Sequence, residues 1–214
     1  MTTKKQEKIK FSKAFWVANT VELFERAAYY GVFIVITLYL SRILGFNDIQ
    51  AASIAGIFSA CLYLLPTFAG ALADKIGFRN SMLLAFTLLT CGYLGLAVYP
   101  TWLQSAGLVE YSTTTTFTGL LESNLQYGII PIMALIVCGG AFIKSVISGT
   151  VAKETTPETR AKGFSIFYAM VNIGAFSGKT IVKPLREALG NEGLITLNYF
   201  CLLYTSPSPR DGAT

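Results

Sequence analysis

The chain contains no histidine, and its four cysteines lie singly inside apolar runs, at Cys61, Cys91, Cys138 and Cys201. Most metal sites need histidine or closely spaced cysteines, and a histidine-based catalytic triad is excluded outright. We therefore expect no metal site and no organic cofactor, and we expect the cysteines to act as small buried hydrophobic residues. No nucleophile–base pair is visible either, so the sequence argues against an enzyme.

Charge is also scarce, because only 14% of the 214 residues are charged while 53% are hydrophobic, and the mean hydropathy is +0.53. An average soluble domain has about 25% charged residues. This composition argues against a soluble enzyme, against intrinsic disorder and, despite a net charge of +5, against nucleic-acid binding. At about 20 residues per spanning helix, the chain has room for five or six helices in a lipid bilayer.

Apolar runs separated by polar breakers predict an all-α, polytopic transmembrane bundle. A basic cytoplasmic arm covers residues 1–14, and a transmembrane bundle covers residues 15–203. The predicted helices cover residues 15–40, 51–73, 81–99, 127–151, 163–182 and 194–203. Residues 204–214 contain two prolines, two serines and an Arg-Asp pair, so we expect a non-native tail that truncates the sixth helix. The alternative is a genuine disordered end on a five-helix protein.

The distribution of basic residues predicts the orientation in the membrane. Basic residues lie in the arm, in the turn after the second helix and in the connector after the fourth, namely Lys4, Lys5, Lys8, Lys10, Lys13, Lys75, Arg79, Lys153, Arg160 and Lys162. The loops on the other side carry only Arg42, Lys183 and Arg186. By the positive-inside rule, the N-terminus is cytoplasmic. The first apolar segment has no cleavage site, so we expect a multi-pass protein of the cell membrane.

Charged residues also occur within the apolar segments, where each costs about 2.5–3.5 kcal/mol on insertion scales. These are Glu22, Glu25, Arg26 and Lys144, with Lys179 as a fifth candidate. The first three share one stripe of the first helix with tyrosines, and such a face must look into the bundle or a water-filled cavity. Two readings are open: a neutral ion-pair cluster that fixes packing, or an ion or substrate pathway in which protonation is coupled to ligand binding.

Four motifs resemble the proton-dependent oligopeptide transporters of the major facilitator superfamily. The first helix carries an ExxER pattern at residues 22–26 followed by Tyr29-Tyr30-Gly31, and the second ends with Gly70, Asp74, Gly77 and Arg79 in the superfamily's gating pattern. Lys144 lies in the fourth helix, and residues 167–176 of the fifth resemble the FYxxxNxGAF signature. The resemblance implies the N-terminal six-helix half of a major facilitator fold, with the sixth helix truncated.

The resemblance also implies roles for these residues. It implies proton-coupled symport of di- and tripeptides by alternating access, with the proton as coupling ion and with a missing C-terminal bundle as partner. Glu22, Glu25, Arg26 and Lys144 would couple protons. The substrate would be bound by Arg26, Tyr29, Tyr30, Tyr63, Lys144 and Asn172. Gly70, Asp74, Gly77 and Arg79 would belong to the gate.

Two positions depart from the family pattern. Many of these transporters have an arginine two residues after the glycine of the first motif, where this chain has Phe33, whereas Lys179 is not part of the pattern. The missing cation favours an alternative with the same fold and a different cargo, a small anion or metabolite. A third possibility is a non-transporting membrane scaffold, in which the buried charges serve packing alone.

Overall fold

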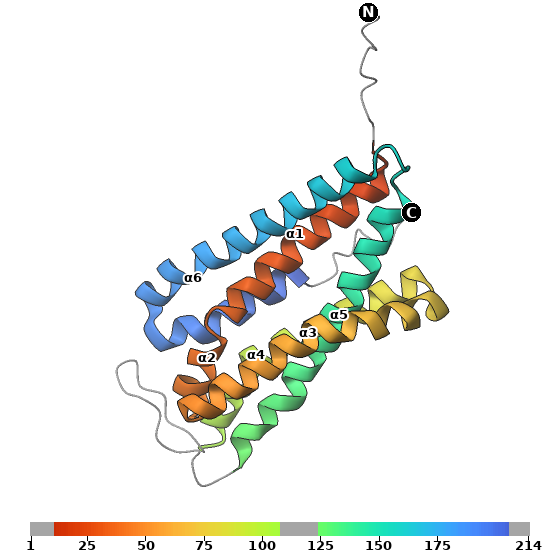
Figure 1. The fold of residues 1–214 in the computed structure, drawn as a ribbon. Coiled ribbons are helices and arrows are strands. Elements are labelled where there is room, and N and C mark those ends of the chain that lie inside the picture. Colours follow the sequence, from red (N-terminus) through yellow and green to blue (C-terminus); the bar gives the residue numbers. More distant parts are fainter. Residues whose placement is uncertain (1–10, 108–123, 206–214) are drawn as a thin grey trace, which may run out of the picture.

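The computed structural model describes residues 11–107 and 124–205, and within those ranges it contains only helices and their connections (Figure 1). The helices are α1 (Lys13–Phe33), α2 (Ile36–Leu38), the π-helical turn η1 (Tyr39–Ile43), α3 (Asp48–Ile76), α4 (Phe78–Ser105), the 3₁₀ turn η2 (Leu125–Gly128), α5 (Ile129–Lys153) and α6 (Arg160–Thr205). The predicted all-α class is confirmed. Most of the basic arm, the threonine-rich run at 113–116 and residues 206–214 lie outside the described residues.

The helix ends follow from local side-chain chemistry. Ser12 begins α1 by accepting a hydrogen bond from the backbone N–H of Phe15 at 3.1 Å. Asn47 and Gln50 form a reciprocal capping box that begins α3. Between α3 and α4, Gly77 adopts φ 84° and ψ 156°, a combination that is essentially restricted to glycine. The chain therefore turns from one long helix into the next at a single residue.

The first predicted helix, over residues 15–40, is bent rather than straight. The chain leaves α-helical geometry after Phe33, and α1 meets the α2–η1 segment at an angle of 44°. Three described helices are long and apolar enough to cross a bilayer, namely α3, α4 and η2 with α5, and the bent pair makes a fourth if it is one span. The predicted count of six spans is thus not confirmed.

The polar stretch at 183–193, expected to separate two helices, lies inside a single helical element, α6. The chain nevertheless reverses direction there, as the α6 ribbon shows (Figure 1). Gly174 packs against Leu23, and Cys201 Sγ lies 3.4 Å from the carbonyl oxygen of Ala28. A straight helix would separate residues 174 and 201 by about 40 Å, so α6 bends, and Pro184 within it supplies the usual cause.

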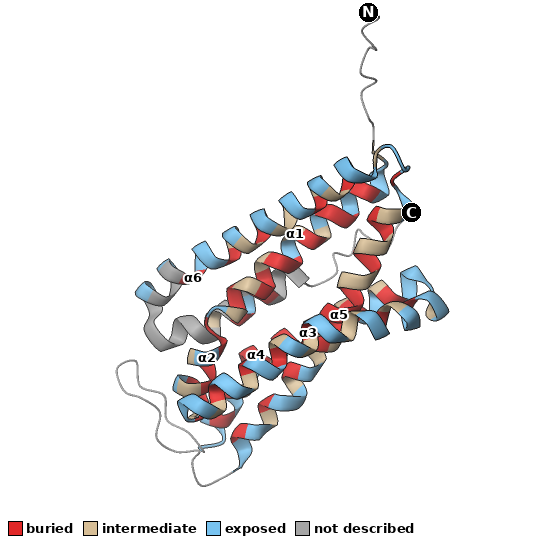
Figure 2. Ribbon diagram, viewed as in Figure 1, coloured by how far each residue is buried: buried red, intermediate tan, exposed pale blue. Residues whose placement is uncertain are grey.

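The helices pack in two groups around a common core. The N-terminal part of α6 lies along α1, while α5 packs against both α3 and α4 (Figure 1). Buried positions follow the inward faces of α1 and α5, and exposed positions cover the outer faces of α3 and α6 (Figure 2). Many exposed residues are large and apolar, such as Phe68 at 75% and Phe176 at 72%. A soluble monomer rarely leaves so much apolar surface uncovered, whereas lipid or further helices cover it in a membrane protein.

Candidate functional site

Three charged side chains of α1 form a buried cluster at the centre of the bundle. Glu22, Glu25 and Arg26 are 2%, 3% and 8% exposed. Their spacing of three and four residues places Glu22 and Arg26 on one helical face. Arg26 Nε lies 3.1 Å from Glu22 Oε1 and 2.5 Å from Glu25 Oε2. One guanidinium thus neutralises two carboxylates only in part, and the three groups alone carry a net negative charge.

Lys144 of α5 approaches this cluster without forming an ion pair. It is half-buried and interacts electrostatically with Glu22 and Glu25. Its Nζ lies over the ring of Tyr63 of α3, 4.5 Å from the centroid. Between side chains that the structure describes, the ion pairs within 4 Å lie inside the α1 cluster. The structure therefore brings Lys144 near the carboxylates, as the sequence implied, and holds its ammonium group on an aromatic face.

A glycine of α5 makes room for one carboxylate. A Cβ atom at Gly140, one turn before Lys144, would lie 3.9 Å from Glu25 Oε1 and 3.0 Å from Leu62 Cδ2. The Glu25 carboxylate therefore faces the backbone of α5 at this point. Because a side chain at Gly140 would crowd Leu62, glycine here allows α1, α3 and α5 to converge on the charge cluster.

The predicted tyrosines lie in three different environments. Tyr29 is buried, stacks on Phe33 and Phe58, and receives the Arg26 guanidinium 5.4 Å above its ring. Tyr30 is half-buried and lies under Lys179 of α6, with Nζ 5.0 Å from the ring centroid. Tyr63 is 66% exposed and lies under Lys144. Each of the three cations therefore faces a different tyrosine, an arrangement that stabilises a cation when it is partly desolvated.

Asn172 of α6 lies outside the cluster and is exposed. It precedes Gly174 by two residues, and a Cβ atom placed on Gly174 would lie 2.9 Å from Arg26 Cβ. The structure therefore places Asn172 on the helix next to the cluster, on a face that the described residues leave open.

A glycine pair that the sequence analysis missed positions α6 on α1. Gly174 and Gly178 form a GxxxG pattern, the small-residue spacing that lets two membrane helices approach closely. A Cβ at Gly174 would collide with the carbonyl oxygen of Leu23, and one at Gly178 would lie 3.0 Å from Gly31 N. The spacing alone could have revealed this contact, and without it Asn172 and Lys179 would lie farther from α1.

Asn19 was also missed by the sequence analysis. It is fully buried one turn before Glu22, and its Nδ2 donates to the carbonyl oxygen of Phe15 at 2.8 Å. Its side-chain oxygen has no hydrogen-bond partner within the part of the chain that the structure describes. Asn19 therefore extends the polar stripe of α1, and its spacing of three residues from Glu22 was the available signal.

Three of the predicted gate residues, Asp74, Gly77 and Arg79, lie at the α3–α4 junction, and Gly70 lies in α3 about two turns before it. A Cβ atom placed on Gly70 would lie 3.6 Å from Ser145 Oγ. That serine donates a hydrogen bond to the carbonyl oxygen of Pro66 at 2.6 Å. Asp74 and Arg79 are both exposed.

Substitution of Gly77 by alanine is expected to lower the stability of the chain by about 1–3 kcal/mol, because only glycine adopts this backbone conformation without strain. Open space surrounds the position, so steric crowding contributes nothing. Thermal unfolding of the detergent-solubilised protein measures the effect. Gly56→Ala, in α3 with equally open surroundings, is the control and is expected to be neutral or slightly stabilising. Equal melting temperatures for the two variants would contradict the prediction.

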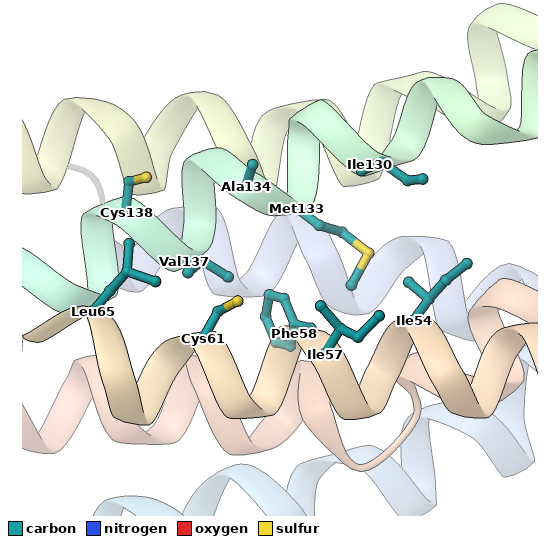
Figure 3. Close-up of a pocket in the computed structure, with 10 residues that line it drawn as sticks. All are labelled: Ile54, Ile57, Phe58, Cys61, Leu65, Ile130, Met133, Ala134, Val137 and Cys138. Atoms are coloured by element: carbon teal, nitrogen blue, oxygen red, sulfur yellow. The ribbon is translucent and has the colours of Figure 1, made fainter.

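An apolar groove lies between α3 and α5. It encloses about 300 Å³, and its walls include Phe58, Cys61, Met133 and Cys138. Phe58 and Cys61 of α3 and Met133 of α5 project into the space between the two helices (Figure 3). An apolar lining lacks the polar groups that orient a charged or zwitterionic ligand. The groove therefore borders the candidate site through Phe58, which stacks on Tyr29, but adds no charged group to it. The described residues contain no cluster suited to a metal ion.

The chain also matches known proteins. The family model described as Major Facilitator Superfamily matches residues 19–182. The dipeptide and tripeptide permease A of Salmonella typhi is 31% identical over 200 residues, which cover 90% of this chain and 34% of that protein. The permease A of Citrobacter koseri (strain ATCC BAA-895 / CDC 4225-83 / SGSC4696) is 26% identical over 195 residues, covering 90% and 34%.

A third relative has a related name. The dipeptide and tripeptide permease B of Yersinia enterocolitica serotype O:8 / biotype 1B is 28% identical over 202 residues, covering 88% of this chain and 36% of the relative. The chain thus spans about a third of the length of the curated relatives it matches. The resemblance to peptide transporters that the motifs indicated is confirmed, and the matching proteins are transporters and not enzymes.

Proposed function

Because the chain belongs to the Major Facilitator Superfamily, we propose that it is the N-terminal part of a symporter that carries di- and tripeptides across the cell membrane together with protons. The observation that supports this most strongly is the buried cluster of Glu22, Glu25 and Arg26 beside Lys144. Intramembrane ionisable groups are costly and mark ion or substrate pathways.

Proton coupling follows from the charge balance of the cluster. Two carboxylates face two cations, so their charges cancel when all four groups are ionised. A peptide carboxylate that approaches Arg26 or Lys144 competes with the glutamates for the same cations. Protonation of one glutamate restores the balance, and in a medium of low dielectric constant such coupling between charges is strong. Peptide and proton therefore bind together and leave together.

The other predicted site residues surround this cluster. Tyr29, Tyr30 and Tyr63 supply ring faces and hydroxyl groups, each beneath a cation. Arg26 and Lys144 attract the peptide carboxylate, because a charge-assisted contact is strongest where water is scarce. Asn172 offers an amide to the peptide backbone from the exposed face of α6. No cofactor takes part other than the transported proton.

The gate and the orientation complete the proposed mechanism. The N-terminus is cytoplasmic, so the α3–α4 junction with Asp74 and Arg79 lies at the cytoplasmic surface. A second six-helix bundle, encoded by a longer chain, closes over the first, with the substrate between them in the bilayer. Alternation between two arrangements of the bundles exposes the site to one side at a time.

Uptake in proteoliposomes tests the proposal. A full-length gene product that contains these 214 residues is reconstituted and supplied with labelled dialanine under an inward proton gradient. Accumulation above the external concentration is expected, and it should collapse when an uncoupler dissipates the gradient. Uptake that is indifferent to the gradient would refute proton coupling, and absence of uptake would refute peptide transport.

A second candidate function, transport of another small anion or metabolite, is favoured by one observation. Phe33 stacks on Tyr29 at a centroid distance of 5.4 Å, so this position adds an aromatic surface to the site and no cation. Thermal-shift binding separates the candidates: stabilisation by organic anions together with none by dipeptides would favour the second. Stabilisation by neither, with no transport, would favour a scaffold.

A further inference from the structure

Lys179 is an intramembrane cation that the charge cluster does not use. It lies on α6 directly after Gly178. The close contact of Gly178 with Ala27 and Gly31 fixes the position of Lys179 along the axis of α1. Its Nζ lies 5.0 Å from the centroid of the Tyr30 ring. Among the side chains that the structure describes, no carboxylate lies within ion-pair distance of it.

The charge balance of the site shows what this lysine lacks. Glu22 and Glu25 balance Arg26 and Lys144, so none of the ion pairs among the described side chains compensates the charge of Lys179. An isolated cation in an apolar segment is costly, and the Tyr30 ring offsets only part of that cost. An anionic group of a ligand would offset the remaining cost of this isolated positive charge.

We propose that Lys179 and Tyr30 form a carboxylate-binding subsite, which takes the C-terminal carboxylate of the transported peptide. This inference rests on the proposed function and adds the position and polarity of the substrate. The carboxylate binds the ammonium group of Lys179 above the ring, in addition to the attraction that Arg26 and Lys144 exert on it in the proposed function. The subsite supplies, from α6, a cation that α1 lacks at Phe33.

The spacing along α6 fits a short peptide. Asn172 and Lys179 are seven residues apart, which is nearly two full turns, so they lie on one stripe about 10.5 Å apart along the axis. An extended chain of two or three residues spans about 7–11 Å. Tyr168 and Phe176, on the same stripe, are 60% and 72% exposed. A tripeptide with its carboxylate at Lys179 would thus reach Asn172 and lie over aromatic side chains.

The test measures discrimination between a carboxylate and an amide. Full-length protein in proteoliposomes takes up labelled dialanine, and unlabelled trialanine and trialanine amide compete with it. The wild type is expected to prefer trialanine by about tenfold or more, as for a charge-assisted hydrogen bond. Lys179→Gln should lose this preference, Lys179→Arg should keep it, and Tyr30→Phe should weaken it less than Tyr30→Leu. Lys162→Gln, at an exposed position near the start of α6, is the matched control.

The outcomes separate this inference from the proposed function. If dialanine is transported and Lys179→Gln keeps the full preference for trialanine, the subsite is refuted while peptide transport stands. If its defect appears only in vesicles that contain phosphatidylglycerol, the lysine pairs with a lipid phosphate and the subsite is again refuted. If no peptide is transported, thermal-shift binding of succinate against succinamide takes the place of uptake. A preference for succinate that depends on Lys179 supports the subsite, and an unchanged preference or none refutes it.

Discussion

Replacement of Glu25 by glutamine is expected to abolish peptide accumulation driven by a proton gradient while it leaves exchange of peptide across the membrane measurable. Glu25 is 3% exposed and its Oε2 lies 2.5 Å from Arg26 Nε. Glutamine has nearly the same shape and cannot take up a proton. In the proposed mechanism net symport moves protons by way of a carboxylate that glutamine lacks, whereas exchange of labelled for unlabelled peptide moves no net charge or proton.

The size of the effect follows from the energy in the gradient. For one coupled proton, a pH difference of one unit supplies about 1.4 kcal/mol, which supports about tenfold accumulation. Wild-type vesicles should approach that limit, and Glu25→Gln vesicles should only equilibrate. Removal of one negative charge also leaves Arg26 and Lys144 in excess, so the variant is expected to bind a peptide carboxylate without requiring a proton.

Glu158→Gln is the matched control for this measurement. Glu158 is exposed in the connector before α6, outside the predicted spans, and a hydrogen bond involving Thr156 lowers its pKa. It is therefore ionised throughout the working pH range, and its substitution removes a charge of the same kind. Gradient-driven accumulation should be unchanged. If Glu25→Gln still accumulates peptide, or if both variants lose accumulation equally, the role given to Glu25 is wrong.

The parts of the fold that sequence could predict are those with a local cause. The helices α3, α4 and α5 follow from long apolar runs, and the junction of α3 with α4 follows from Gly77. The predicted end of the helix over 81–99 was wrong, because α4 continues through Pro100 to Ser105. The bend after Phe33 has no such cause, since neither proline nor glycine lies between Ile34 and Leu40. The polar stretch at 183–193 predicted a break between two helices, whereas the structure has a bend within α6. The same polar residues are compatible with a loop and with a bent helix, so the sequence could not distinguish the two.

The candidate site divides along a similar line. The stripe of Glu22, Glu25 and Arg26 follows from helical periodicity within one element, and the structure gives it the expected ion pairs. The place of Lys144 over Tyr63 depends on how α3 and α5 cross, which is a relation between distant segments. Lys179 over Tyr30 is of the same kind, although the GxxxG spacing could have indicated which face of α6 meets α1.

That helix contact leads to the second prediction with a large effect, the substitution of Gly178 by leucine. A Cβ at this position would lie 3.0 Å from Ala27 C and 3.0 Å from Gly31 N, both backbone atoms that cannot move without displacing α1. Overpacking of this kind costs about 1–3 kcal/mol, and the remaining atoms of leucine increase the separation of the helices. The melting temperature of the solubilised chain should fall by several degrees, about 2–4 °C for each kcal/mol.

Gly56→Leu is the control, because Gly56 is also in a long apolar helix and a Cβ atom placed there would have no neighbouring atom within 4 Å. It should leave the melting temperature nearly unchanged. A smaller substitution, Gly178→Ala, should fall between the wild type and Gly178→Leu, since it adds only the crowded Cβ atom. Separation of α6 from α1 also moves Lys179 away from Tyr30. The Gly178→Ala variant should therefore lose its preference for a peptide carboxylate over the corresponding amide, even where only part of the protein is folded. A fully stable Gly178→Leu protein would show that α6 is held in place by its C-terminal part, where Cys201 contacts Ala28, and not by the glycine pair.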